Sequence, residues 1–155
     1  MKKIILISGL LFCVMLLPKP MLAEQNLDCK ELEKVFDTKV EAENGTCKVE
    51  ITRKDLDVIH MGKKLSPETM ELVFHFAFEN VDGGTAVIGE MALLDDEVSG
   101  VVDELRNGKL EISAIHNHHL HEQPKIMYLH FQGIGDKSQQ AAVIQKAIET
   151  TGYKK

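Results

Sequence analysis

The chain has 155 residues and an acidic composition, with 24 Asp and Glu against 18 Lys and Arg and a net charge of −6. This balance argues against nucleic acid as a partner, because that binding depends on Lys and Arg side chains that neutralise phosphates. It argues against an anionic membrane surface for the same reason. A chain of this length is expected to form one domain with one core.

Residues 1–23 have the pattern of a cleaved secretory signal peptide. Two lysines precede an apolar run over residues 4–17, two prolines follow, and Ala23 offers a small residue at the cleavage point. The run is shorter than the roughly 20 apolar residues of a membrane span, so we expect no stable membrane insertion after cleavage. An uncleaved N-terminal anchor is the alternative. Cleavage would leave 15 basic and 24 acidic residues, a net charge of −9, in a periplasmic or extracellular chain that begins near Glu24.

The expected mature chain keeps two cysteines, Cys29 and Cys47. An even number of cysteines in an oxidising compartment predicts a disulfide bond, with two free thiols as the alternative. Closing a loop of this size contributes about 3 kcal/mol in the loop-entropy model. No C-x-x-C spacing is present, which argues against a metal site made of cysteines alone.

The first part of the expected mature chain, residues 24–46, is polar and predicts an N-terminal extension of helix and loop. Residues 47–155 predict a single α+β domain. Phenylalanines that alternate along residues 72–78 indicate a buried strand, and Asp82-Gly83-Gly84 indicates a hairpin turn after it. The remaining expected elements are helices over 28–36, about 95–107 and 136–151, strands over 48–53, 56–60, 85–94, 110–118 and 125–132, and a turn between Gly133 and Gly135.

From residue 72 onward the expected order is strand, strand, helix, strand, strand, helix. Each helix can cover the same face of one antiparallel sheet. The predicted fold class is therefore α+β, a two-layer sandwich of an antiparallel sheet with two helices on one face. Moving the last strand of a ferredoxin-like order to the front gives the same sequence of elements, so we predict a permuted ferredoxin-like (ββαββα) core.

Five of the seven histidines lie between residues 116 and 130. His116 and His118 are two apart on a predicted strand and therefore project from one face. His130 on the next strand joins them only when the numbers of paired residues add to an even sum, as when 116 pairs with 130 or 118 with 128. Neutral imidazoles suit divalent transition metals, of which zinc is the first candidate. Ordinary polar surface is the alternative.

Glu90 is the candidate for a fourth metal ligand. It lies in the middle of an otherwise apolar strand, where a carboxylate is costly unless it is paired or bound to a metal. The alternative is that Glu90 faces solvent. We expect His119 and His121 to be solvated loop residues and His60 to lie on the surface. We expect His75 to be structural, with a place in the metal site as the alternative.

Several segments considered together resemble a known family. They are Arg53-Lys54-Asp55-Leu56, Gly89-Glu90-Met91-Ala92-Leu93-Leu94, Ile115-His116-Asn117-His118 and Pro124-Lys125-Ile126-Met127-Tyr128-Leu129-His130. Over roughly residues 33–150 the chain is similar to the LppY/LpqO family of exported bacterial proteins, a domain family without an assigned activity. The resemblance places the family's pattern on Arg53, Asp55, Glu90, Glu97, His116, Asn117, His118, His130 and Gly135. It implies one fold and the location of a site, and no reaction.

The leading hypothesis is an exported domain that binds a transition metal through His116, His118 and His130. A metal-dependent hydrolase or lyase that uses the same site is the first alternative, and an open fourth ligand position would favour it. The second alternative is a metal-free module for a small anionic ligand, in which Arg53 and His116 hold the anion and Asn117 belongs to the ligand site. The sequence leaves binding and catalysis both open.

Overall fold

The computed structural model describes residues 27–154, so the predicted signal peptide lies outside the described residues. No helix of the described part is long and apolar enough to cross a membrane. The elements in chain order are α1 (Cys29–Phe36), β1 (Val40–Glu43), β2 (Thr46–Thr52), β3 (Ile59–His60), β4 (Lys63–Lys64), β5 (Val73–Val81), β6 (Gly84–Leu94), α2 (Val98–Asn107), β7 (Glu111–His116), β8 (Ile126–Gly135) and α3 (Lys137–Glu149).

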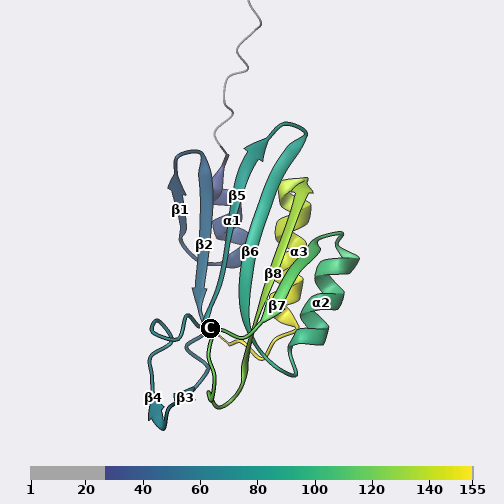
Figure 1. The fold of residues 1–155 in the computed structure, drawn as a ribbon. Helices are drawn as coiled ribbons and strands as arrows, with labels where there is room; N and C mark the ends of the chain where they lie inside the picture. The colour runs from purple at the N-terminus through teal and green to yellow at the C-terminus, as the bar shows by residue number, and fades with distance from the viewer. Residues whose placement is uncertain (1–26, 155) are drawn as a thin grey trace, which may run out of the picture.

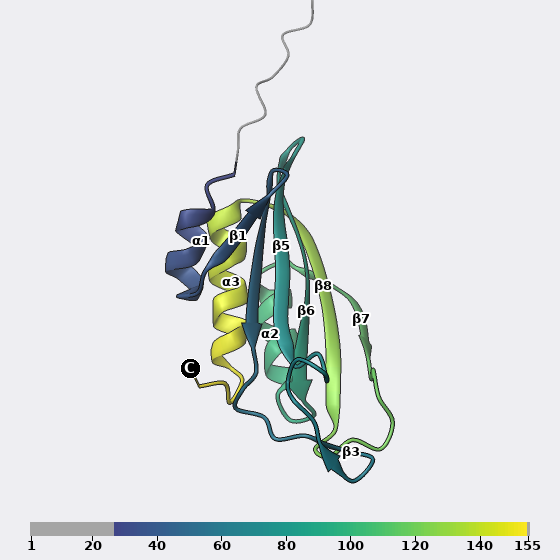
Figure 2. The same ribbon diagram turned by 90° about the vertical axis from the view of Figure 1, so that its left-hand side faces the viewer.

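Six strands form one antiparallel sheet in the order β1-β2-β5-β6-β8-β7, and β3 and β4 form a separate two-stranded ribbon. All three helices lie on one face of the sheet (Figures 1 and 2). The predicted α+β sandwich is therefore confirmed, with α1 as a third helix on the same face. The permuted ferredoxin-like topology stays a prediction.

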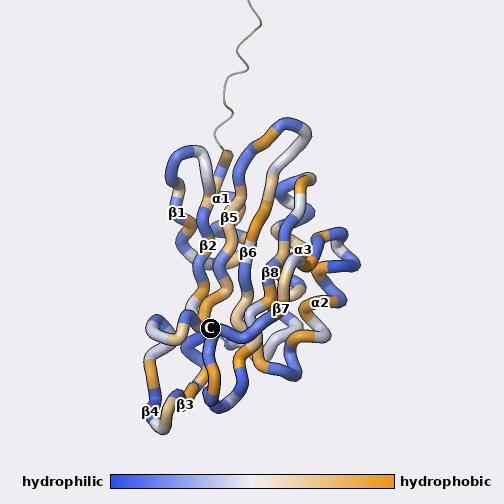
Figure 3. The backbone as a smooth tube through the Cα atoms, viewed as in Figure 1, coloured by the Kyte–Doolittle hydropathy of each residue, from blue (hydrophilic) through white to orange (hydrophobic). Residues whose placement is uncertain are grey.

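The main core lies between the sheet and the helices. Phe74, Phe76 and Phe78 of β5 are completely buried there, as their alternation predicts. Figure 3 shows a long hydrophobic stretch in β6 at the centre of the sheet. Phe36 of α1 packs edge-on against Phe76, with 4.8 Å between ring centroids. The described part of the expected N-terminal extension thus belongs to the core, and its strand β1 widens the sheet.

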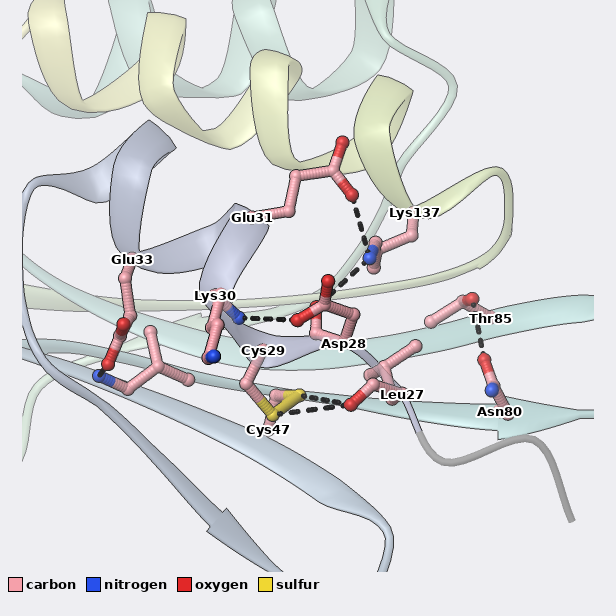
Figure 4. The surroundings of a disulfide bond; sticks show 11 residues. Leu27, Asp28, Cys29, Lys30, Glu31, Glu33, Cys47, Asn80, Thr85 and Lys137 are labelled. Carbon is pink, nitrogen blue, oxygen red and sulfur yellow. Dashed lines mark hydrogen bonds and ion pairs between the residues drawn. A yellow bond between two sulfur atoms is a disulfide. The ribbon is translucent and has the colours of Figure 1, made fainter.

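The predicted disulfide bond is confirmed between Cys29 and Cys47. It joins the first residue of α1 to β2, next to the point where Asp28 caps the helix by accepting a hydrogen bond from the backbone N–H of Lys30 (Figure 4). The bond closes a loop with a sequence separation of 18 residues. It therefore holds the small helix α1 against the sheet.

We expect a Cys29→Ser/Cys47→Ser double variant to lose about 3 kcal/mol of unfolding free energy, because its unfolded chain regains the entropy of the open loop. Urea unfolding of both proteins without reductant measures the difference. A variant with the urea midpoint of the wild type would show that the bond contributes nothing to stability.

A second core lies on the opposite face of the sheet. Met91 and Leu93 of β6 point into the main core, whereas Ala92 between them points away from the helices. Residues 53–72 connect β2 to β5 and are called the cover segment below. They pack on the face that points away from the helices, at the end of the sheet where β2 ends and β5 begins. The second core consists of Leu56, Val58, Met70, Leu72, Ala92, Ile126 and Tyr128.

Several expected boundaries are wrong, each for a local reason. The strand expected over 56–60 is reduced to Ile59–His60, because Leu56 and Val58 enter the second core. Helix α2 begins at Val98, since residues 95–97 form a turn. Gly133 and Gly135 lie inside β8, not around a turn: β8 stays paired with β6 as far as Gly135, and the missing side chain of Gly133 makes room for Leu110.

Candidate metal site

The site lies on the face of the sheet that the helices leave uncovered. Glu90 of β6 is the pairing partner of His130 of β8, and His130 pairs in turn with Ala114 of β7. His116 pairs with Tyr128, so the predicted even sum of paired numbers is confirmed, and His116 is a diagonal neighbour of His130. A β-bulge at Ser113 shifts the register between Ile112 and Ala114, and Ser113 itself is exposed.

His118 is not on a strand, because β7 ends at His116. It lies in residues 117–125, called the β7–β8 loop below. Its ring stacks on Tyr128, with centroids 3.5 Å apart and planes at 4°, and its Nδ1 lies 3.1 Å from Oε2 of Glu71. Tyr128 itself is buried and donates a 2.6 Å hydrogen bond to the carbonyl of Met70. The second core therefore holds the Tyr128 ring on which His118 stacks.

The predicted metal ligands come together. Ring nitrogens of His116, His118 and His130, called the three-histidine cluster below, all lie within 4.8 Å of one another and could hold a metal ion. Nε2 of His116 is 2.9 Å from Nε2 of His130, and Oε2 of Glu90 is 2.9 Å from the latter atom. The same oxygen is 3.7 Å from Nε2 of His118. Two donors on one tetrahedral zinc lie about 3.3 Å apart when each bond is about 2.0–2.1 Å, so these spacings suit a shared ion.

Carboxylates surround the three-histidine cluster. Glu90 is only 12% exposed, whereas Glu71 is 65% exposed at the rim. A cavity of about 410 Å³ adjoins His118, and four glutamates are among its lining residues: Glu50, Glu68, Glu71 and Glu90. Burial raises the pKa of Tyr128, and the charges of Glu71, Glu90 and Glu122 raise it further, so this phenol stays neutral. The electrostatics of the site favour a cation.

Arg53 is placed where it cannot bind a ligand. It is completely buried, and its guanidinium carbon lies 5.0 Å from the ring centroid of Phe74. All five of its N–H groups donate to protein oxygens, on the carboxylates of Asp55 and Glu97 and on the carbonyl of Ala92. The predicted role of Arg53 in holding an anion is therefore wrong, and its role is structural.

Asn117 also has a structural role. Its side-chain amide donates a 2.9 Å hydrogen bond to the carbonyl of Ile126, which ties the first residue of the β7–β8 loop to the start of β8. The amide also lies 3.2 Å from Sδ of Met127. Asn117 thereby fixes the point from which His118 leaves the strand, and its contribution to the site is one of positioning.

The outer histidines differ in their surroundings. His75 is exposed on β5 beside Glu90, and His121 is exposed with a positive φ of 68°. His60 and His119 are not the surface and solvated residues we expect, because each has a buried ring nitrogen. Glu71, the partner of His118, carries no signal in the sequence, because it lies 47 residues away from His118 in the chain and in no strand.

Comparison with known proteins identifies one family. A domain family with the description "Domain of Unknown Function (DUF1259)" matches residues 30–150. No curated protein and no solved structure matches the chain. The match agrees with the expected resemblance in its extent and in the absence of an assigned activity.

Proposed function

The chain belongs to the DUF1259 family of uncharacterised domains, and we propose that it is an exported domain that binds a divalent transition metal, with zinc as the first candidate. The ligands are His116, His118 and His130, and Glu90 supplies the fourth. The observation that carries this proposal is the convergence of three imidazole nitrogens within 4.8 Å of one another, with a carboxylate oxygen of Glu90 beside His118 and His130.

The contacts between these groups support a shared cation. Nε2 of His116 and Nε2 of His130 face each other, and only one of two facing nitrogens can carry the proton of a hydrogen bond. An ion between them would engage both lone pairs. Glu71 also favours a bound ion. When Nδ1–H of His118 donates a hydrogen bond to the Glu71 carboxylate, Nε2 of His118 is left free to bind the ion.

A metal-dependent hydrolase or lyase is the second candidate function. The observation that favours it is the cavity of about 410 Å³ beside His118, which would give a small substrate access to the ion. Coordination by Glu90 would close the fourth position on the ion, which favours a metal-binding protein over an enzyme. An ion held by the three histidines alone would keep a position for water, as in catalytic sites. The metal-free module for an anion is not supported, because Arg53 is buried and the glutamates that line the cavity would repel an anion.

Export is part of the proposal. A disulfide bond persists in oxidising compartments, so the Cys29–Cys47 bond supports a periplasmic or extracellular location. We also propose that the family match corresponds to the LppY/LpqO family. The intact mass of the protein recovered from the periplasm or medium tests export, because it should correspond to a chain that begins near Glu24. A mass that includes residues 1–23 would contradict cleavage.

Calorimetric titration of Zn²⁺ into untagged, metal-free protein tests the proposed function. We expect saturable binding at pH 7.5 and an affinity at least about tenfold weaker at pH 5.5, because imidazoles must be neutral to bind a metal. The absence of saturable binding at pH 7.5, or an affinity that does not change with pH, would contradict a histidine site.

A further inference from the structure

One of the proposed metal ligands is held differently from the others. Glu90 and His130 lie inside the paired strands β6 and β8, and His116 is the last paired residue of β7. Strand pairing therefore fixes where these three side chains project. His118 lies in the β7–β8 loop, outside the strands that the structure describes, so the direction of its ring depends on contacts of the side chain.

Two contacts orient the His118 ring, and both lead to the cover segment. The ring stacks on Tyr128, and the Tyr128 hydroxyl donates a 2.6 Å hydrogen bond to the carbonyl of Met70. At the edge of the ring, Nδ1 lies 3.1 Å from Oε2 of Glu71. Met70 and Glu71 are adjacent in the chain. The four residues thus form a closed circuit of contacts between the β7–β8 loop, β8 and the cover segment.

The packing of the cover segment fixes the place of the Glu71 carboxylate. Glu71 is exposed, whereas its neighbours Met70 and Leu72 are buried in the second core. The carbonyl of Leu72 also accepts a 2.7 Å hydrogen bond from the backbone N–H of Arg53. An exposed ion pair between flexible side chains is worth little by itself. The buried neighbours therefore give the contact between Glu71 and His118 its defined position.

The contact suits a carboxylate that orients a metal ligand. An Nδ1–H of His118 that donates to Glu71 fixes the tautomer, and it leaves Nε2 as the nitrogen that binds the ion. Nε2 lies on the side of the site, 3.7 Å from Oε2 of Glu90. Glu71 would thus act on the ion through His118.

We propose that Glu71 is a positioning residue, which couples the docking of the cover segment to the binding of the ion. The inference rests on the function proposed above and deepens it, because it states what controls the affinity of the three-histidine cluster. A docked cover segment presents His118 to the ion, and a bound ion holds the cover segment in place through the same contacts. Such a coupling is reciprocal, so the two effects have the same size.

Calorimetric titration of zinc into metal-free variants tests the positioning role. We expect Glu71→Ala to lower the affinity by about 10–100-fold, the usual cost of losing a group that orients a metal ligand. The same substitution in a His118→Ala background should change the affinity by less than about twofold, because the residue through which Glu71 acts is gone. Glu68→Gln is the matched control, since Glu68 carries the same charge in the same segment and lines the same cavity. Its effect should stay below about threefold, as for an exposed charge.

Glu71→Gln guards against a change of structure, because it keeps the size of the side chain and an oxygen that accepts the hydrogen bond. It should recover part of the affinity that Glu71→Ala loses. A loss of affinity that is equal with and without His118 would show that Glu71 acts only as a charge, and would overturn the inference. A Glu71→Ala variant with wild-type affinity would overturn it too and leave the proposed function standing, whereas a wild type that binds no zinc would contradict the proposed function itself.

Amide hydrogen exchange tests the coupling in the other direction. At saturating zinc, exchange of residues 53–72 that proceeds through opening of the cover segment should slow by at least the factor that Glu71→Ala costs in zinc affinity. Glu71→Ala should remove most of this slowing. If the wild type binds zinc and the exchange of residues 53–72 does not change, the coupling is wrong and the metal site is unaffected.

Discussion

Replacement of His118 or His130 by alanine is expected to lower the affinity of the three-histidine cluster for zinc by more than about 100-fold. Loss of a group that only orients a ligand already costs roughly 10–100-fold in metal affinity, and loss of a ligand removes a bond to the ion itself. Both residues contact the central carboxylate of Glu90, His130 at 2.9 Å and His118 at 3.7 Å. Calorimetric titration of zinc into each metal-free variant measures the change.

His121→Ala is the matched control for these two variants. His121 lies in the same β7–β8 loop as His118, is exposed, and is outside the three-histidine cluster. Its removal should change the affinity by less than about twofold. If both His118→Ala and His130→Ala bind zinc as tightly as the wild type, the cluster is ordinary polar surface.

Glu97→Ala is expected to lower the unfolding free energy by about 3–5 kcal/mol, the usual cost of removing one partner of a buried ion pair. Glu97 holds Arg53 by two short contacts of 2.8 and 3.0 Å, and Arg53 is completely buried. The same carboxylate accepts hydrogen bonds from the backbone N–H groups of Leu94 and Gly152. Its loss would leave part of a buried guanidinium and two backbone donors without partners.

Urea unfolding at pH 7 measures this loss, and Asp57→Ala provides the control. Asp57 pairs with Lys64 at 2.6 Å, but both side chains are exposed, so its removal should cost less than about 1 kcal/mol. A Glu97→Ala variant with the urea midpoint of the wild type would show that the Arg53–Glu97 pair contributes nothing to stability.

The same pair gives stability a dependence on pH. Burial alone would raise the pKa of Glu97, but hydrogen bonds from Arg53, Leu94 and Gly152 outweigh it and hold the pKa below its ordinary value of 4.5. The contribution of Glu97 is therefore complete above that ordinary value and is lost as the pH falls through the lower pKa of the folded protein. Unfolding measured between pH 7 and pH 3 should show a smaller loss of stability for Glu97→Ala than for the wild type.

The sheet and helices could be predicted where the pattern is local. The alternating phenylalanines of β5 face one core, and Asp28 and Asp136 cap the first and last helices as side chains of their type do. The even pairing sum of β7 and β8 agrees with the burial of Leu129 and Phe131 in the main core, because strand side chains alternate and His116 and His130 then lie on the other face.

The remaining features depend on contacts between distant segments. The cover segment has no strand or helix period, so its packing over Tyr128 could not be read from the sequence, and neither could the stack of His118 on that ring. The sequence leaves Arg53 as a candidate ligand-binding residue, because its partner Glu97 lies 44 residues later in the chain and only the fold brings the two together.

The location of the bound ion tests the central proposal most directly. Crystals of the untagged protein soaked in zinc, with diffraction measured on both sides of the zinc absorption edge, would show the ion as an anomalous peak. We expect a peak about 2.0–2.1 Å from a ring nitrogen of each of His116, His118 and His130, with Glu90 as the fourth ligand. Zinc-soaked crystals with no anomalous peak among His116, His118 and His130 would contradict the proposed function.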